Sequence, residues 1–145
     1  VLNTFCQERN YTSTHLGREF LATAPTDDNY TSASDCCRLL SEIYNGTLVN
    51  ADASADMLAL LQAQTRTSKI PAGVPDNVTT ANKTGELSDP GNLGVVENDI
   101  SIIFAKGHPY VLCVLSNNIQ NNSSAQETIS KISADVYKYM TSQQP

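Results

Sequence analysis

A chain of 145 residues, 40% of them apolar, is long enough for a single domain with its own core, because folding near this size buries roughly two-thirds of the unfolded surface. Its net charge of −6 at pH 7 argues against nucleic acid as a partner and gives no reason to expect an anionic membrane surface. No apolar run approaches the roughly 18 residues of a membrane span, and the first five residues lack the basic start and apolar centre of a signal peptide.

The cysteine and histidine residues do not form a metal-binding pattern. None of the four cysteines has Cys-x-x-Cys spacing, and both histidines stand far from them in sequence. We therefore expect no metal site and no cofactor. Three of the cysteines fall on apolar positions of periodic segments, where free Cys acts as a small hydrophobe, so we expect reduced thiols. The cysteines are Cys6, Cys36, Cys37 and Cys113.

The first quarter of the chain reads as a short helix followed by a long loop. Apolar residues recur at helical spacing from Val1 to Cys6, which predicts the last turns of a helix, and the absence of an initiator Met suggests a piece of a longer protein. Residues 10–28 are polar and contain Gly17 and Pro25, so we predict an irregular loop anchored by Leu16, Phe20 and Leu21. Loops of this length are usually functional or disordered.

Two helices are predicted next. Ser32 or Ser34 can cap a helix that runs to about Asn45, with Gly46 as its stop. Its apolar stripe consists of Cys36, Leu39, Leu40, Ile43 and Tyr44. A second helix from about Ser54 to Gln64 presents Met57, Leu58, Leu60 and Leu61 to the core, and Pro71 and Pro75 forbid its continuation.

The pattern then changes to strands. Residues 79–87, 94–106 and 109–117 are strand-like and are joined by turn sequences at 89–92 and 106–108. Residues 124–127 form a capping box that opens a final helix, with Ile129, Ile132, Val136 and Met140 on one face. The predicted fold class is α+β in one domain: residues 1–78 are mainly helical with an Ω-like loop at about 10–29, and residues 79–145 form a three-stranded antiparallel sheet with the last helix packed on it.

Lys83-Thr84-Gly85 lies on the first predicted strand and can serve substrate binding. Lys83 supplies a positive charge and Thr84 a hydroxyl donor, which together can hold a carboxylate. Gly85 has no Cβ, so a substrate backbone can lie against the strand edge. The backbone N–H of Glu86 can then point at an acyl oxygen as half of an oxyanion hole. As a bare triplet, the same three residues are more often an ordinary strand end.

Three further motifs stand in a fixed order around this triplet. Asn29-Tyr30-Thr31-Ser32 precedes a helix, Ile70-Pro71-Ala72-Gly73-Val74-Pro75 precedes the triplet, and Glu97-Asn98-Asp99-Ile100 follows it. In this order the chain resembles the second half of class A β-lactamase-like serine hydrolases, the group that includes penicillin-binding D-alanyl-D-alanine peptidases. The resemblance covers essentially all 145 residues.

The resemblance implies a function, but two catalytic motifs of the family are missing from this chain. The family's nucleophile lies in Ser-x-x-Lys and a second serine in Ser-Asp-Asn, and neither motif occurs in this chain. The chain thus resembles a C-terminal portion that supplies the substrate-binding strand. For the whole protein the resemblance implies a β-lactam or D-alanyl-D-alanine peptide as substrate and an extracellular or cell-envelope location in a bacterium.

The loop at residues 15–29 departs from the family as well. In class A β-lactamases this loop carries a glutamate that activates the deacylating water, held in place by an arginine and its acidic partner. Arg18 fits the arginine, whereas Asn29 stands where the acidic residue is expected, so we predict that the ion pair is lost. Glu19 is either the catalytic glutamate or a solvated loop carboxylate. If it does not reach the water, the acyl-enzyme is long-lived.

Two functions are compatible with these motifs. The first is a serine acyl-transferase or hydrolase. The second is a catalytically inactive relative that keeps the carboxylate pocket and binds cell-wall peptides or a protein partner. An accidental match by an unrelated α+β domain is a third reading. A Ser-x-x-Lys motif upstream of Val1 would separate the first two.

The resemblance also implies association. In the similar fold, the strand around residues 110–115 pairs on its far side with a strand from near the N-terminus of the whole protein, which this chain lacks. An unpaired strand edge is a template for another chain, and Leu2 and Phe5 would also be uncovered. We expect a homo-oligomer or association with a separately supplied N-terminal part.

We predict that the 145-residue chain alone does not hydrolyse a chromogenic β-lactam above the buffer rate. A carboxylate-binding strand without a serine nucleophile offers binding but no acyl transfer. Initial rates with and without the chain test this prediction, and hydrolysis that a serine-directed inhibitor stops would contradict it.

Overall fold

The structure, a computed structural model, describes residues 1–19, 22, 27–87 and 95–142. Four helices and three strands follow one another in the order predicted, so the α+β class is confirmed, and a short 3₁₀ turn that was not predicted lies between the third helix and the first strand. No helix within these ranges is both long and apolar enough to cross a membrane. The elements are α1 (Leu2–Glu8), α2 (Ala33–Tyr44), α3 (Ala51–Gln62), η1 (Pro71–Gly73), β1 (Thr80–Leu87), β2 (Val96–Ile103), β3 (Tyr110–Val114) and α4 (Asn122–Ser142).

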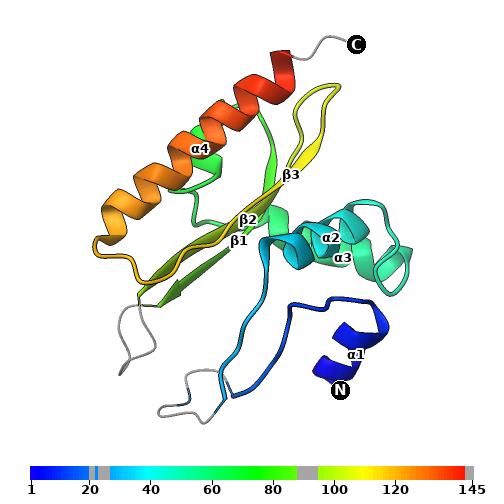
Figure 1. Cartoon of the computed structure of the whole chain (residues 1–145). Coiled ribbons are helices and arrows are strands. Elements are labelled where there is room, and N and C mark those ends of the chain that lie inside the picture. The colour runs from blue at the N-terminus through cyan, green and yellow to red at the C-terminus, as the bar shows by residue number, and fades with distance from the viewer. Residues whose placement is uncertain (20–21, 23–26, 88–94, 143–145) are drawn as a thin grey trace.

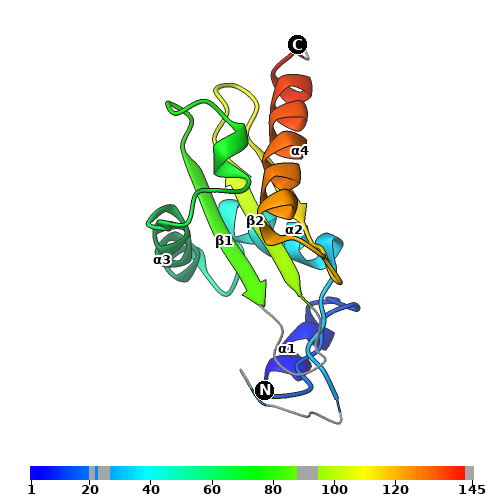
Figure 2. The same cartoon turned by 90° about the vertical axis from the view of Figure 1, so that its left-hand side faces the viewer.

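The elements form three layers around the sheet (Figure 1). The strand order is β1-β2-β3, and both pairs are antiparallel. Helix α4 and the turn η1 cover one face, while α2 and α3 cover the other. Figure 2 shows β1 at the outer edge of the sheet with α3 beside it. Each face therefore has its own core.

The two cores follow from the alternation of side chains along each strand. On the α2/α3 face, Ala81 and Ile102 pack against Leu40, Ile43 and Leu48. The core on the α4 face contains Ile70, Val74, Ile103, Ala105 and Ile129. Since neighbouring residues of one strand point to opposite faces, β1 and β2 contribute to both layers.

Helices α2 and α3 begin with side-chain caps. The backbone N–H of Asp35 donates to the Ser32 hydroxyl at 3.1 Å, which confirms one of the two caps expected for α2. Helix α3 begins earlier than predicted, because Asn50 caps it by accepting from the Ala53 N–H at 2.8 Å. Ser54 instead donates to the Leu48 carbonyl. The prediction that Leu60 faces the core is wrong: it is 75% exposed.

Helix α4 starts at Asn122, so the capping box predicted at residues 124–127 is wrong. Asn121 is the cap, since its side-chain oxygen accepts from the Ser124 N–H at 2.8 Å. The predicted apolar face is also rotated. Ile129 is buried as expected, but Ile132 is 39% exposed, whereas Ser133 is fully buried and donates to the Ile70 carbonyl at 2.8 Å. A buried serine with a partner thus occupies the place where sequence periodicity puts an apolar residue.

Close approach of η1 to α4 fixes this orientation. A Cβ on Gly73 would collide with the carbonyl oxygen of Ser130 and the Cβ of Ser133. Glycine is therefore required here for the two backbones to meet. The contact places the residues just before η1 against the sheet.

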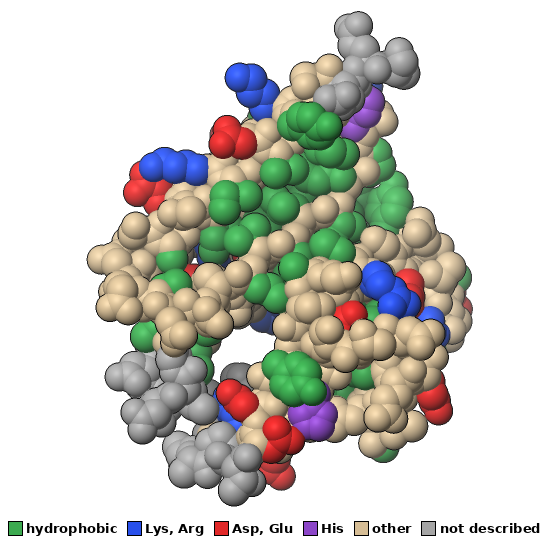
Figure 3. Space-filling view, viewed as in Figure 1, with side chains coloured by type: hydrophobic (Ala, Val, Ile, Leu, Met, Phe, Trp, Pro, Cys, Tyr) green, Lys and Arg blue, Asp and Glu red, His purple; other side chains and the backbone are tan. Residues whose placement is uncertain are grey.

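Both outer strands have an edge without a partner strand among the described residues. The free edge of β3 lies between α4 and α2, and Figure 3 shows apolar side chains gathered along this region of the surface. Unpaired backbone groups beside apolar side chains favour the addition of another strand. The expected homo-oligomer, or association with an N-terminal part, stays a prediction.

We predict that Asn121→Ala lowers the free energy of unfolding by about 1 kcal/mol, because the first turn of α4 loses its cap. Ser124→Ala, the matched control, should change it little, since the Ser124 side chain is exposed in the first turn. Urea titrations of both variants and the wild type measure this. If Ser124→Ala lowered the free energy of unfolding as much as Asn121→Ala, Ser124 would be the cap, as the capping box predicts.

Candidate active site

The triplet Lys83-Thr84-Gly85 lies in the middle of β1, at the edge of the sheet. Alternation places Lys83 and Gly85 toward the α2/α3 face, whereas Thr84 and Glu86 point toward α4. The pairing register sets Thr84 opposite Asp99 and Glu86 opposite Glu97. The triplet therefore contributes to two different environments.

The hydrogen bonds of β1 decide which backbone groups are free. The Phe104 N–H donates to the Thr79 carbonyl at 3.0 Å, so residues 79 and 104 form a hydrogen-bonded pair. In an antiparallel ladder such pairs alternate with non-bonded ones. The register then directs the carbonyl of Thr84 and the N–H of Glu86 away from β2, toward the free edge. The Lys83 ammonium lies at the same edge and donates to the Thr84 carbonyl at 2.6 Å.

The Thr84 side chain does not lie where we expected. The residue is only 4% exposed, and its hydroxyl donates to a carboxylate oxygen of Glu86 at 3.3 Å. The expectation that this hydroxyl helps Lys83 to hold a carboxylate stays a prediction, and in this structure its partner is Glu86. The cause is the alternation of the strand, which turns Thr84 inward.

Gly85 is not demanded by the packing of the fold. A Cβ at this position would lie 3.5 Å from the Cβ of Asn98, an ordinary van der Waals contact. The absence of a side chain here leaves the surface of β1 open beside Lys83.

A buried ion network lies behind the triplet, and the sequence analysis missed its centre. Lys69 is 1% exposed, and its ammonium donates to Glu86 at 2.8 Å and to Glu97 at 2.7 Å. Arg66 also contacts Glu86 at 3.1 Å. The only sequence signal was the alternation of acidic residues in Glu97-Asn98-Asp99, which places two carboxylates on one face of β2.

Side chains from other elements complete the network. The second oxygen of Glu97 accepts from Asn122 and Gln126 of α4, both at 3.0 Å. Asp99 accepts from the Ile70 N–H at 2.9 Å and from the Asn82 side chain at 3.1 Å. Each buried carboxylate therefore has at least two donors, as groups with a high desolvation cost require.

The pKa values of these carboxyls move in opposite directions. Burial alone raises the pKa of Glu97, but hydrogen bonds from Lys69, Gln126 and Asn122 outweigh burial and hold it below its usual value of 4.5. The pKa of Glu86 is lowered in the same way, against burial, by Lys69 and Thr84. For Asp99, burial dominates and raises the pKa despite its donors. Lys69 therefore favours the ionised forms of Glu86 and Glu97.

The loop before α2 keeps an ion pair, contrary to prediction. Arg18 donates to Asp28, the residue before Asn29, at 2.6 Å. The Asn29 side-chain oxygen instead accepts from the N–H groups of Gly17 and Arg18. The carboxylate that pairs with Arg18 therefore belongs to Asp28, one residue before the predicted position. Asn29 instead binds the backbone of Gly17 and Arg18.

Polar contacts hold the described part of this loop, and Leu16, one of the predicted apolar anchors, is exposed. His15 and Tyr30 pair as an isolated bridge, and Asn3 exchanges two hydrogen bonds with the backbone of Leu16, which is 45% exposed. Phe20 and Leu21 lie outside the described residues. Glu19 is an exposed residue, so the loop presents its carboxylate to solvent.

Comparison with known proteins decides the family. A model of the β-lactamase enzyme family matches residues 1–140. The chain belongs to the β-lactamase enzyme family. A search of curated proteins found no match.

Several solved structures share this fold. A β-lactamase from Sphaerobacter thermophilus DSM 20745 is 20% identical with a TM-score of 0.85, over 99% of this chain and 54% of that one. A representative class A β-lactamase from Bacteroides cellulosilyticus DSM 14838 is 20% identical with a TM-score of 0.78, over 98% and 54%. PBP-A is 20% identical with a TM-score of 0.74, over 95% and 51%. This β-lactamase-family chain spans about half the length of these structures, and at this identity they show the fold alone.

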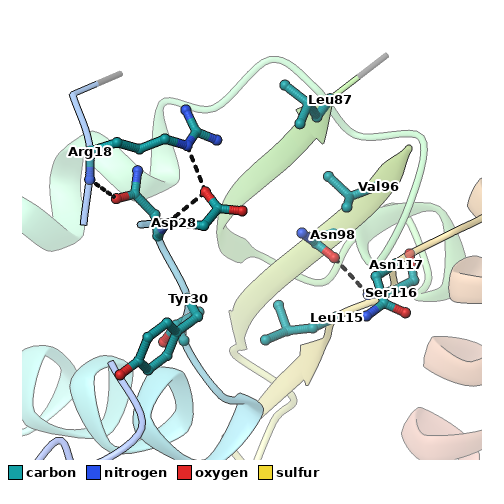
Figure 4. Close-up of a pocket in the computed structure, with 11 residues that line it drawn as sticks. Arg18, Asp28, Tyr30, Leu87, Val96, Asn98, Leu115, Ser116 and Asn117 are labelled. Atoms are coloured by element: carbon teal, nitrogen blue, oxygen red, sulfur yellow. Dashed lines mark hydrogen bonds and ion pairs between the residues drawn. The ribbon is translucent and has the colours of Figure 1, made fainter. Parts of the chain in front are cut away.

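The β-lactamase-family chain has a cavity of about 550 Å³ between the loop and the strand ends (Figure 4). Arg18 and Asp28 line one side, while Leu87, Val96 and Asn98 line the other. Lys83 is not part of it. Lys83 instead borders a separate groove of about 280 Å³ whose other walls are mainly apolar side chains of α2 and α3. The triplet is therefore an open strand edge within the described residues.

We predict that acid weakens the fold through Glu86 and Glu97. Their folded-state pKa values are lowered, so their contribution is present above the usual value of 4.5 and is lost as pH falls through the folded-state values. Glu97→Gln should therefore lose less stability than the wild type between about pH 5 and about pH 3. Urea midpoints across this range measure the difference.

Asp99→Asn is the control with the opposite sign. The raised pKa of Asp99 favours folding at low pH, and this contribution is lost as pH rises through the folded-state value. A Glu97→Gln variant with the same acid sensitivity as the wild type would contradict the role of this network.

Proposed function

We propose that the protein containing this chain is a β-lactamase-type serine hydrolase that acts on β-lactams or D-alanyl-D-alanine peptides through an acyl-enzyme. In this proposal the chain supplies the strand that binds the substrate carboxylate and the acyl oxygen. Membership of the β-lactamase enzyme family supports the reaction class. The proposed location is the cell envelope or the exterior of a bacterium, where such substrates are met.

The observation that carries the proposal is the arrangement at the free edge of β1. Three groups lie there: the Lys83 ammonium, the Thr84 carbonyl, which accepts from it at 2.6 Å, and the N–H of Glu86. Within the described residues, this edge presents a cation and an N–H donor that points away from β2, which matches a ligand with a carboxylate and a carbonyl. An acylating β-lactam or peptide has both.

Lys83 supplies the charge that binds the carboxylate. A charge-assisted hydrogen bond to a carboxylate is stronger than the bond from Lys83 to a neutral carbonyl, so the ligand can displace the Thr84 oxygen. The Thr84 hydroxyl can follow, since its bond to Glu86 at 3.3 Å is longer than is usual for a hydroxyl donor. We propose that both side chains then share the substrate carboxylate.

The N–H of Glu86 stabilises the oxygen on which charge develops during acylation. A backbone donor on a paired strand is already oriented, so little reorganisation is needed in the transition state. Gly85, immediately before it, leaves the strand open for the substrate backbone, and the fold itself tolerates a Cβ there. This contrast supports a role for Gly85 in substrate approach.

The nucleophile and the deacylating base are the remaining parts. No Ser-x-x-Lys occurs in this chain, so we propose that the serine lies elsewhere in the longer protein. Glu19 is the candidate base, held by a loop in which Arg18 and Asp28 form the ion pair. If Glu19 stays in solvent, the acyl-enzyme persists, as in a penicillin-binding protein.

The alternative is a catalytically inactive module that binds cell-wall peptides or a protein partner. The lack of both Ser-x-x-Lys and Ser-Asp-Asn in this chain leaves it as the alternative. Labelling of the longer protein with a fluorescent penicillin distinguishes the two. A stable adduct or rapid turnover supports the hydrolase, and no reaction supports the module.

We predict that Lys83→Ala in the longer protein slows acylation by fluorescent penicillin about 10- to 100-fold, because a charge-assisted bond of roughly 1.5–3 kcal/mol is lost. The melting temperature should change little, since the residue is exposed on a strand edge. Lys106→Ala is the matched control, because Lys106 is another exposed lysine and lies in the turn between β2 and β3. Equal acylation of Lys83→Ala and wild type would mean that the triplet is only a strand end.

A further inference from the structure

Two free thiols lie between α2 and β3, away from the free edge of β1. Cys37 belongs to α2 and Cys113 to β3. Helix α2 packs directly on β3, so one thiol comes from each side of this contact. The function proposed above uses neither residue.

The two cores show which side chains of β3 face α2. Val111 and Cys113 pack against the core on the α2/α3 face, whereas Tyr110, Leu112 and Val114 pack against the core on the α4 face. Such alternation is expected along a strand. Cys113 therefore points toward α2.

Helix α2 and strand β3 run antiparallel to each other. Thr31, near the start of the helix, lines the cavity of about 550 Å³ together with Leu115, which follows β3. Tyr44, the last residue of the helix, lines another cavity of about 370 Å³ together with Tyr110, the first residue of β3. Contacts at both ends therefore show how the helix lies along the strand.

This alignment sets Cys113 beside the first turns of α2. Cys113 precedes Leu115 by two residues, which is about 7 Å along a strand. The same distance from Thr31, at about 1.5 Å per helix residue, leads to the turn that contains Cys36 and Cys37. The thiol of Cys113 therefore faces this turn.

Cys37 is the nearer of these two thiols to Cys113. The Cys36 thiol lies 3.6 Å from the hydroxyl of Thr31 at the start of the helix. Cys37 lines the cavity of about 370 Å³ together with Val111, the next residue of β3 on the same face as Cys113. Burial raises the pKa of Cys113 above its usual value of 9.0, and contact with the Cys37 thiol raises it further.

We propose that Cys37 and Cys113 are a modification site, where oxidation forms a disulfide that joins α2 to β3. The thiolate of Cys37, which lines a cavity, attacks a small-molecule disulfide and releases the first thiol of that molecule. The thiolate of Cys113 then attacks the sulfur of Cys37 in the mixed disulfide and releases the second thiol. Two protein thiols are oxidised, the small disulfide is reduced to two thiols, and the two protons pass to the released thiols.

Oxidising compartments such as the cell envelope and the exterior of the cell allow this reaction. That is the location proposed above, but the pairing itself depends only on the packing of α2 on β3. The disulfide closes a loop of roughly 75 residues, which removes conformational entropy from the unfolded chain. For a domain of this size we expect the melting temperature to rise by about 10 °C.

Oxidation of the longer protein in a buffer of reduced and oxidised glutathione tests the proposal. Remaining thiols are alkylated, and the protein is digested without reduction and mapped by mass spectrometry. We expect a peptide pair linked through Cys37 and Cys113, with Cys6 and Cys36 alkylated. The linked protein should melt about 10 °C higher than the same sample after reduction.

The neighbouring cysteine supplies a matched control. Cys36→Ser should link as the wild type does, whereas Cys37→Ser and Cys113→Ser should not link. If a serine variant does not fold, fragmentation of the wild-type peptide between residues 36 and 37 makes the same assignment. Each measurement therefore distinguishes two thiols that are adjacent in sequence.

The other outcomes overturn the inference. A link through Cys36, a link between two chains, or no link in the folded protein would mean that the native packing does not bring Cys37 and Cys113 together. A linked protein that melts no higher than the reduced one would mean that the link strains the fold. Acylation by penicillin is a separate measurement, so failure of the proposed function leaves this result unchanged.

Discussion

The structure depends on one buried ammonium. Lys69 joins three parts of the chain that are distant in sequence: the segment before η1, the end of β1 and the start of β2, with α4 reached through Glu97. Removal of one partner from a buried ion network costs about 3–5 kcal/mol, a large share of the stability of a domain this size. The network therefore couples the sheet, η1 and α4 energetically in this region. The cost of burying these charges is offset because every carboxylate has more than one donor.

Strand alternation couples this network to the free edge of β1. Thr84 and Glu86 point toward Lys69, whereas Lys83 and Gly85 point toward the α2/α3 face. On one face of β1, the side chains of Thr84 and Glu86 are therefore held by hydrogen bonds, while on the other face Lys83 and Gly85 leave the surface open. The backbone groups at the edge belong to Thr84, whose side chain is buried, and to Glu86, whose partly exposed carboxylate is held by Lys69 and Arg66. This arrangement gives a preorganised donor without a closed pocket.

Sequence patterns predicted the parts of the fold that local physics determines. The cap at Ser32 and the three strands were found because capping chemistry and β-propensity act over a few residues. Two of the errors have a different cause. Ser133 is buried where Ile132 was expected because it bonds the Ile70 carbonyl, and Lys69 was overlooked because its partners lie on other elements. The other two errors are local: Asn121 caps α4 in place of Ser124, and Arg18 pairs with Asp28, one residue before the predicted position.

The hydrogen bonds that Lys83 and Thr84 make without a ligand affect how the free edge of β1 would bind a carboxylate in the proposed function. The Lys83 ammonium donates to the Thr84 carbonyl, and the Thr84 hydroxyl donates to Glu86. Both donors therefore already have hydrogen-bond partners without a ligand. Binding then exchanges hydrogen bonds instead of adding them, and the net gain per bond is small. What the ligand adds is negative charge beside Lys83. In the proposed function, recognition at this edge is therefore mainly electrostatic and sensitive to salt, because exposed charges are screened over about 10 Å at 0.1 M ionic strength.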